Sequence, residues 1–270
     1  MLNRVNMFTK KDNDRDLIES RHIERGRGRP PGTTQQGLAT RRHLYETAIQ
    51  LIAMRGYEAT TLRDVAHSAG VSVGLLYKYF PSKRAVVLSL YDDLSAEYAR
   101  RGAAMESGKW RNRFLFALQT SLDVLRPHRE TLITLIPVLV GSRDEGLFAT
   151  STAFSRIRVQ KVFRDAVVGA SDAPSPKVAE SLGRLLYMLH LNIILLWLLD
   201  KTSRQRATSA FVVLLQKSLS SLSLALHIAP VRSFVCSADD LLQEAIFSVD
   251  PAVQEMLEAS SRQTSRAEDS

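Results

Sequence analysis

Apolar side chains recur at helical spacing along most of the chain. In the stretch that begins at Arg41, four apolar positions fall on one helical face, with Thr40 as the candidate N-cap and Gly56 after the end: Leu44, Ala48, Leu51 and Ile52. A shorter helix follows, and Thr61 and Asp64 have the spacing of a capping box at its start. No segment shows convincing strand-like alternation, so we predict an all-α fold.

The pattern divides the chain into four parts. Residues 1–37 are polar, charged and without apolar periodicity, which predicts a disordered basic arm. Residues 38–98 carry the three N-terminal helices and most of a longer helix predicted at 83–105. A larger helical domain follows at 109–230, with helices predicted at 109–126, 129–140, 150–169, 176–199 and 205–228. Past Pro230 the chain becomes polar again, and we predict a tail, 231–270, with two short helices at 237–247 and 251–259.

The stretch VSVGLLYKYFPSK, residues 71–83, predicts a helix with two contrasting faces. With Ser72 as N-cap, Leu76 and Phe80 share a face that can pack on the preceding helices. Lys78 lies nearly opposite, beside a glycine and a leucine, and such a small apolar face with one cation suits insertion into a groove. Gly70 can supply the positive φ of a tight turn before this helix. Residues 61–80 therefore have the pattern of a helix-turn-helix.

The residues that carry this pattern resemble the DNA-binding domain of the TetR family of bacterial transcriptional regulators. They are Ala48 to Ile52 with Gly56, Thr60, Thr61, Val65, Ala66, Ala69 to Ser72, Gly74, Tyr77, Phe80 and Lys83. The resemblance covers about residues 38–98 and is specific, because many fixed spacings agree across three helices. The rest of the chain resembles the family only in being helical and of suitable length. The resemblance implies a DNA-binding transcriptional regulator without enzymatic activity, and it favours a repressor.

The resemblance also implies roles for individual residues. Positions that face base edges are Val73, Gly74, Leu75 and Lys78, and positions that touch phosphates are Thr61, Ser72, Tyr77, Tyr79 and Lys83. Because Lys78 can donate to guanine O6 and N7, we predict it to be the main hydrogen-bonding base reader. The alternative is that Lys78 is another phosphate contact. The chain departs from the family at Arg84, where many members carry glutamate; this cation near a helix N-terminus could face a phosphate or only solvent.

The segment ERGRGRPPG carries arginines at alternate positions before a diproline: Arg25, Arg27 and Arg29. Its RGRP core resembles an AT-hook, an element that lies in the narrow minor groove of A·T-rich DNA, where extended arginines meet a strong negative potential. Basic arms that precede DNA-binding domains commonly reach the adjacent minor groove. The alternative is an ordinary solubilising basic tail.

Composition narrows the class of protein further. The 36 Lys and Arg against 28 Asp and Glu give a net charge of +8, which predicts an anionic partner, either nucleic acid or an acidic membrane surface. The lone Cys236 excludes an intrachain disulfide and a multi-cysteine zinc site, and it fits a reducing cytoplasm. Phosphate-binding loops, nucleophile elbows and metal-type histidine spacings do not occur in the sequence, so we predict no cofactor, no metal and no enzyme.

The C-terminal half predicts a dimer and a ligand pocket. One helix-turn-helix has a small footprint, and the resemblance implies a homodimer, formed by the last two helices of the core domain, on a palindromic operator. It also implies that helices between 109 and 199 surround a pocket for a small, unknown effector, which the apolar richness suggests is hydrophobic. Candidate lining residues are Trp110, Phe114, Phe116, Phe148, Phe154, Trp197, His190 and Asn192; the alternative for each is a place in the core or an interface.

Two other classes of protein stay open. The apolar run 185–199 contains His190 and Asn192 and is shorter than the about 20 residues that a membrane span needs, so we predict a buried helix rather than a membrane contact. A membrane-associated protein would use this run and residues 211–228. An architectural binder of A·T-rich DNA would use the arginine arm and need no effector.

Overall fold

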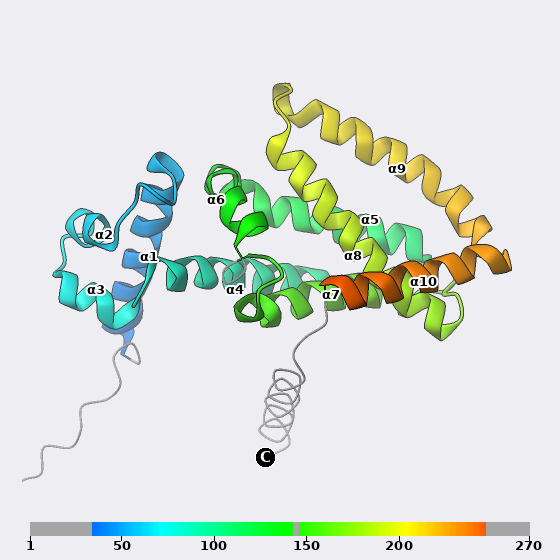
Figure 1. Cartoon of the computed structure of the whole chain (residues 1–270), viewed down its shortest axis with the longest axis horizontal. Coiled ribbons are helices and arrows are strands. Elements are labelled where there is room, and N and C mark those ends of the chain that lie inside the picture. Colours follow the sequence, from blue (N-terminus) through cyan, green and yellow to red (C-terminus); the bar gives the residue numbers. More distant parts are fainter. Residues whose placement is uncertain (1–33, 143–145, 247–270) are drawn as a thin grey trace, which may run out of the picture.

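The computed structural model describes residues 34–142 and 146–246, and all regular secondary structure in these ranges is helical. A small unit at one end of the molecule contains α1 (Gln35–Arg55), α2 (Leu62–Ser68) and α3 (Val73–Tyr79), and α4 (Lys83–Gly102) runs from it into a larger bundle (Figure 1). The bundle contains α5 (Trp110–Leu125), α6 (Arg129–Gly141), α7 (Ala153–Val168), α8 (Pro176–Leu199), α9 (Arg206–Ala225) and α10 (Ala229–Ile246), with short 3₁₀ turns at Arg126–His128, Thr150–Thr152 and Ser203–Gln205. The all-α prediction is confirmed.

The first helix begins earlier than the sequence pattern predicts. Thr34, rather than Thr40, is its N-cap, because the Thr34 side chain accepts a hydrogen bond of 3.0 Å from the Gly37 N–H. The Thr40 hydroxyl instead donates back to the Gln36 carbonyl at 2.8 Å. The last residues assigned to the arm are therefore the first turn of α1. The rest of the predicted arm, with its three arginines, lies outside the described residues.

The small unit is held by a compact apolar core. Leu44, Ala48 and Ile52 project from α1, and Leu76 with Phe80 seals the core from the α3 side; all five are at most 1 % exposed. The shared face predicted for Leu76 and Phe80 is confirmed. Burial of this face orients α3, so that its opposite face must point to solvent.

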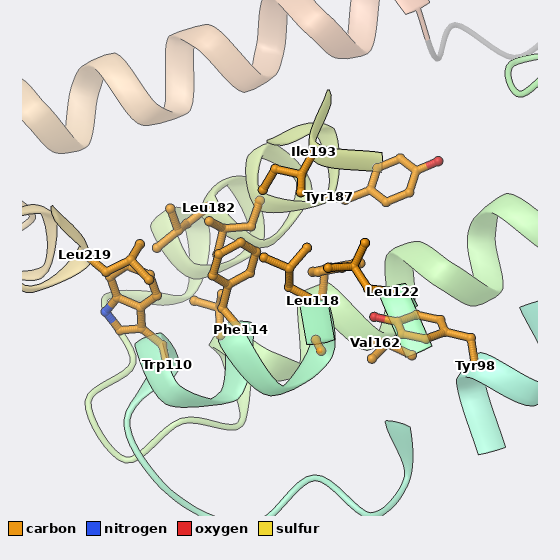
Figure 2. Close-up of a cluster of buried hydrophobic side chains, with 14 of the residues drawn as sticks. Tyr98, Trp110, Phe114, Leu118, Leu122, Val162, Leu182, Tyr187, Ile193 and Leu219 are labelled. Carbon is orange, nitrogen blue, oxygen red and sulfur yellow. The ribbon is translucent and has the colours of Figure 1, made fainter. Parts of the chain in front are cut away.

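The larger unit is built around α7 and α8, which approach each other closely at Gly183. A Cβ atom placed on Gly183 would lie 2.8 Å from the Cα atom of Arg164 on α7, so only glycine permits this spacing. Side chains from α4, α5, α7 and α8 converge beside this crossing, and Figure 2 shows Trp110, Phe114 and Tyr187 among them. The aromatic rings thus fill the centre of the bundle.

Two helical segments of the described chain, Pro176–Leu199 and Ser203–Ala225, are long and apolar enough to cross a membrane by length and composition alone. In the most apolar window of α8, 44 % of the residues are buried inside the protein, and these include His190, Ile193 and Trp197. This burial is typical of a core helix, as predicted for residues 185–199. A core helix of this length and composition is only weak evidence that a protein crosses a membrane.

The C-terminal helix differs from the prediction. We expected a break at Pro230 and a short helix at 237–247, but α10 is one helix from Ala229 to Ile246. Pro230 stands in its first turn, where a missing N–H costs nothing. The helix packs along α8, and Arg184 holds Asp239 through both carboxylate oxygens at 2.6–3.1 Å. The remaining helices end within about one turn of the predicted positions, and the helix predicted at 251–259 lies outside the described residues.

Candidate nucleic-acid interface and ligand cavity

The second helix of the small unit is fixed at its start by the capping box that the sequence predicts. The Asp64 N–H donates to Thr61 Oγ1 at 3.2 Å, and Asp64 Oδ2 accepts from both the Thr61 N–H (2.9 Å) and the Thr61 hydroxyl (2.7 Å). These bonds to Thr61 lower the pKa of the Asp64 carboxyl. The Thr61 hydroxyl hydrogen is therefore already engaged, although the resemblance assigns this residue a phosphate contact.

A tight turn joins α2 to α3. Gly70 has a φ of 65°, the left-handed conformation predicted for it, and the Val71 N–H donates to the Ala66 carbonyl at 3.0 Å across the turn. Ser72 is the N-cap of α3, since its side chain accepts from the Leu75 N–H at 3.2 Å. The two helices thus form the predicted helix-turn-helix.

The outward face of α3 is open along its length. Val73, Gly74, Tyr77 and Lys78 are exposed, whereas Leu75 and Tyr79 are half-buried. A Cβ atom on Gly74 would meet nothing within 4 Å. Lys78 makes no hydrogen bond or ion pair with other residues in the described ranges, so its ammonium is available to an external acceptor. The residues predicted to read bases therefore lie on one face, with Leu75 at its edge.

Lys83 has a structural role that the sequence did not reveal. Its ammonium donates to the Tyr57 carbonyl at 2.6 Å and lies 4.4 Å from the centre of the Tyr57 ring. A cation on an aromatic face and a charge-assisted hydrogen bond both tie the start of α4 to the loop after α1. Of the predicted phosphate-contacting residues, Thr61, Ser72 and Tyr77 are exposed, whereas Tyr79 and Lys83 are half-buried.

The sequence analysis did not consider Arg63 as a candidate for contact with DNA. It is exposed on α2, in the helix-turn-helix itself. Its position in the sequence indicates this exposure, because a residue directly after Leu62 points away from the core when Leu62 and Val65 are buried.

The larger unit contains a cavity of about 350 Å³ that is lined by residues of α4, α5, α6, α7 and α8 and is partly open to solvent. This volume is in the usual range for small-molecule sites. Its walls are largely apolar, and leucine and isoleucine side chains from α6 and α8 contribute to them. Of the predicted lining residues, Phe148, His190 and Asn192 lie on its wall; Asn192 donates its amide to the Met188 carbonyl at 2.9 Å.

The other predicted pocket residues lie elsewhere. Trp110 and Phe114 are 1 % and 0 % exposed in the aromatic core, because they fall on the face of α5 that meets α7 and α8. Trp110 also borders a second, more polar cavity near the start of α8. Phe154 is 61 % exposed beneath the Arg158 guanidinium, Phe116 is exposed, and Trp197 is buried under Arg129. Helical spacing identifies apolar residues but does not distinguish a cavity wall from a filled core.

Several polar side chains of the cavity wall were missed by sequence reasoning, because they come from different helices. Ser121 Oγ lies 2.7 Å from His190 Nε2, whereas His190 Nδ1 and the Tyr98 hydroxyl are buried and have no hydrogen-bond partner among the described residues. Burial lowers the pKa of His190 to about 3 and raises that of Tyr98 well above its usual range, so both side chains are neutral at neutral pH. Within the described ranges no cluster of His, Cys, Asp and Glu could hold a metal ion.

Comparisons with known proteins concern mainly the small unit. Residues 44–90 match the family described as bacterial regulatory proteins, tetR family. The chain is 40 % identical over 74 residues to the HTH-type transcriptional repressor KstR2 of Rhodococcus jostii (strain RHA1), and 43 % identical over 47 residues to the uncharacterized HTH-type transcriptional regulator YuxN of Bacillus subtilis (strain 168). These matches cover 26 % and 17 % of this chain and only 36 % and 16 % of those proteins.

The whole fold also has counterparts among solved structures. A tetR-family transcriptional regulator from Streptomyces coelicolor matches with a TM-score of 0.51 and 22 % identity over 75 % of this chain and 90 % of that one. The TetR transcriptional regulator from Nitrosomonas europaea ATCC 19718 matches with a TM-score of 0.50 and 19 % identity over 68 % and 97 %. At such identities the likeness is one of fold, an N-terminal helix-turn-helix unit followed by a larger helical domain. The family match shows that residues 44–90 are a helix-turn-helix DNA-binding domain of the tetR family of bacterial regulatory proteins.

Proposed function

We propose that this protein is a sequence-specific transcriptional repressor that places α3 in the major groove of DNA. The observation that carries the proposal is the open face of α3, with Val73, Gly74, Tyr77 and Lys78 exposed over a rigid apolar core. Phosphate contacts would orient the domain and base contacts would specify the site. A DNA partner and a reduced Cys236 both fit the bacterial cytoplasm.

Lys78 is the proposed hydrogen-bonding base reader, with Val73 and Leu75 against thymine methyl groups. Lys78→Ala should weaken binding to the preferred site by about 1–3 kcal/mol and relax the preference at one base pair. Lys177→Ala, which removes an equal charge from the exposed start of α8, is the matched control. An equal loss on all DNA sequences with a shallower salt dependence would instead make Lys78 a phosphate contact.

We further propose a homodimer that forms through α9 and the end of α8. Of the residues of α9, only Thr208 and Leu219 are buried, whereas Phe211, Val213, Leu214 and Leu224 are 39–73 % exposed. Such an apolar surface is unusual on an isolated chain and fits a second copy. Leu214→Glu should give a monomer in light-scattering measurements, because it buries an unpaired charge, and Ile157→Glu on α7 should not. A monomeric parent protein would exclude this interface.

The cavity is the proposed effector site, and α6 links it to the DNA-binding unit. Leu132, Ile136 and Leu139 of α6 line the cavity, and Leu135 of the same helix packs in the core of the small unit. The Thr134 hydroxyl also contacts the Ile52 carbonyl of α1 at 3.3 Å. A ligand that moves α6 would thus reorient α1 and change the spacing of two helix-turn-helix units. This gives a division into a DNA-binding unit and an effector-binding and dimerisation unit that includes α10.

The test is selection of DNA fragments from the source genome by the purified full chain at near-physiological salt, followed by footprinting. A short inverted repeat near a promoter would support a dimeric regulator, and its neighbouring genes would suggest effectors. Diffuse A·T-rich enrichment without a repeat would favour an architectural binder that relies on Arg25, Arg27 and Arg29. A chain without residues 1–32 separates these outcomes, since it would lose affinity mainly at A·T-flanked sites if the arm enters the minor groove.

A further inference from the structure

One part of the cavity wall is polar and carries a buried cation. Thr152, Ser155 and Arg156, from the turn before α7 and its first residues, line the cavity there. Arg156 is only 8 % exposed, and its Nη1 atom donates to the carbonyls of Leu147 and Ala149 at 3.1 and 3.3 Å. Leu147 lines the cavity as well, so these bonds fix the guanidinium at this part of the wall.

Tyr187 of α8 adds a hydroxyl that borders the same cavity. The residue is only 2 % exposed, and its hydroxyl makes no hydrogen bond within the described ranges. Unlike the Tyr98 hydroxyl, it is not sealed from water. In Figure 2 Tyr187 points from α8 away from Trp110 and Phe114, which lie in the filled part of the core. Because the cavity is the space that Tyr187 lines, its hydroxyl is open to a ligand there.

Arg156 and Tyr187 lie close enough to influence each other's ionisation. Burial lowers the pKa of the Arg156 guanidinium, and the electrostatic interaction with Tyr187 opposes this shift. Burial raises the pKa of Tyr187 well above its usual range, and the interaction with Arg156 lowers it only in part. At neutral pH Arg156 is therefore a cation that has lost part of its hydration, and Tyr187 is a neutral hydrogen-bond donor.

The charge of the wall favours an anionic group on the ligand. Aspartate and glutamate do not occur among the described lining residues, and His190 on the same wall is neutral because burial lowers its pKa to about 3. A cation in such a poorly hydrated place attracts an anion more strongly than a cation in water does. Arginine also matches the geometry of a carboxylate. The remaining surface of the ligand must be apolar, because it would face side chains such as Leu132, Ile136 and Leu195.

We propose that the ligand of this cavity is an amphipathic organic acid, with its carboxylate at Arg156 and Tyr187 and its hydrocarbon body in the apolar part. The inference deepens the proposed effector role and rests on it only for the consequence of binding. Ligand binding itself is a separate property of the cavity.

The experiment compares decanoate with 1-decanol, which have the same number of carbon atoms but differ in charge, by titration calorimetry on the full chain at neutral pH. Decanoate should bind at least about tenfold more tightly, as expected for a hydrogen bond between charged groups. Arg156→Gln should reduce this preference to less than about threefold, and Arg156→Lys, which keeps the charge, should retain part of it. Because the two probes share the apolar chain, a variant that only distorts the cavity would weaken both and leave their ratio unchanged.

Tyr187→Phe tests the second contact. It should weaken decanoate binding by about three- to tenfold, the contribution of one hydrogen bond. Tyr98→Phe is the matched control, because it removes a hydroxyl that is sealed from water from another tyrosine of the lining; decanoate affinity should then change by less than about twofold. Because the Tyr187 hydroxyl has no hydrogen-bond partner among the described residues, Tyr187→Phe should unfold at the same or a higher urea concentration, which excludes misfolding as the cause.

Equal or tighter binding of 1-decanol, or a preference for decanoate that survives Arg156→Gln, would overturn the ligand assignment, and so would a parent protein that binds neither probe. Release of operator DNA is measured in parallel with the same probes. Arg156-dependent binding of decanoate without DNA release would support the ligand assignment and contradict the effector role. Release by 1-decanol without decanoate binding would contradict the ligand assignment and keep the effector role.

Discussion

Adding one methyl group at Gly74 should change the stability of the protein and its affinity for DNA in opposite directions. It is exposed in the first turn of α3, and an added Cβ atom would meet nothing within 4 Å in the free protein. Alanine also restricts the unfolded chain, so Gly74→Ala should raise the free energy of unfolding by about 0.5–1 kcal/mol. In the complex the same methyl group would occupy space needed for close approach of the α3 backbone to DNA. Overpacking at a close-packed contact costs about 1–3 kcal/mol, which corresponds to about 5- to 150-fold weaker binding.

The two effects have opposite signs and need two measurements. Urea unfolding gives the stability change, and fluorescence anisotropy with the selected operator gives the affinity change at fixed salt. Binding to a fragment without the operator is the control, because contacts to phosphates alone should be less sensitive to the methyl group. A variant that is more stable and binds the operator as tightly as the parent would show that Gly74 does not approach the DNA. The orientation of α3 in the groove would then have to be revised.

Three further predictions concern the larger unit. Gly183→Ala should lower the free energy of unfolding in urea by about 1–3 kcal/mol, because its Cβ atom would lie 2.8 Å from the Arg164 backbone; unchanged stability would show that α7 and α8 separate freely. Asp239→Ala should lower the free energy of unfolding by about 2 kcal/mol, because it breaks a bidentate pair with Arg184; the partial exposure of Arg184 limits the loss. The same variant should make α10 more accessible to protease, and unchanged cleavage of α10 would contradict this. Burial lowers the pKa of His190 from 6.5 to about 3 in the folded protein, so between these pH values the unfolded chain binds more protons than the folded one. The free energy of unfolding should therefore fall as the pH drops below about 6.5, by up to about 1.4 kcal/mol per pH unit. His190→Gln should flatten this dependence relative to the parent, and parallel pH curves would refute it.

The helix-turn-helix could be predicted because its signals are local. Asp64 follows Thr61 by three residues, Gly70 adopts its φ of 65° without strain because it has no Cβ atom, and Ser72 caps the helix that it precedes. Each of these interactions joins residues within one or two turns, so the order of residues alone specifies it. The start of α1 was placed too late for a related reason, since Thr34 and Thr40 are both capable caps and only the backbone conformation shows which one is used.

Other features depended on contacts between distant segments. Lys83 looks like a surface cation in the sequence, but the chain returns it to Tyr57, and Asp239 meets Arg184 only because α10 packs on α8. Likewise, Trp110 and His190 both lie on apolar faces, yet one fills the core and the other lines the cavity. The sequence by itself determined the class of fold and the helix-turn-helix, because helical periodicity and caps are local. Only the tertiary structure decided where the cavity lies and which polar groups face it, because a cavity exists where five helices fail to close on one another, and no segment carries that information alone.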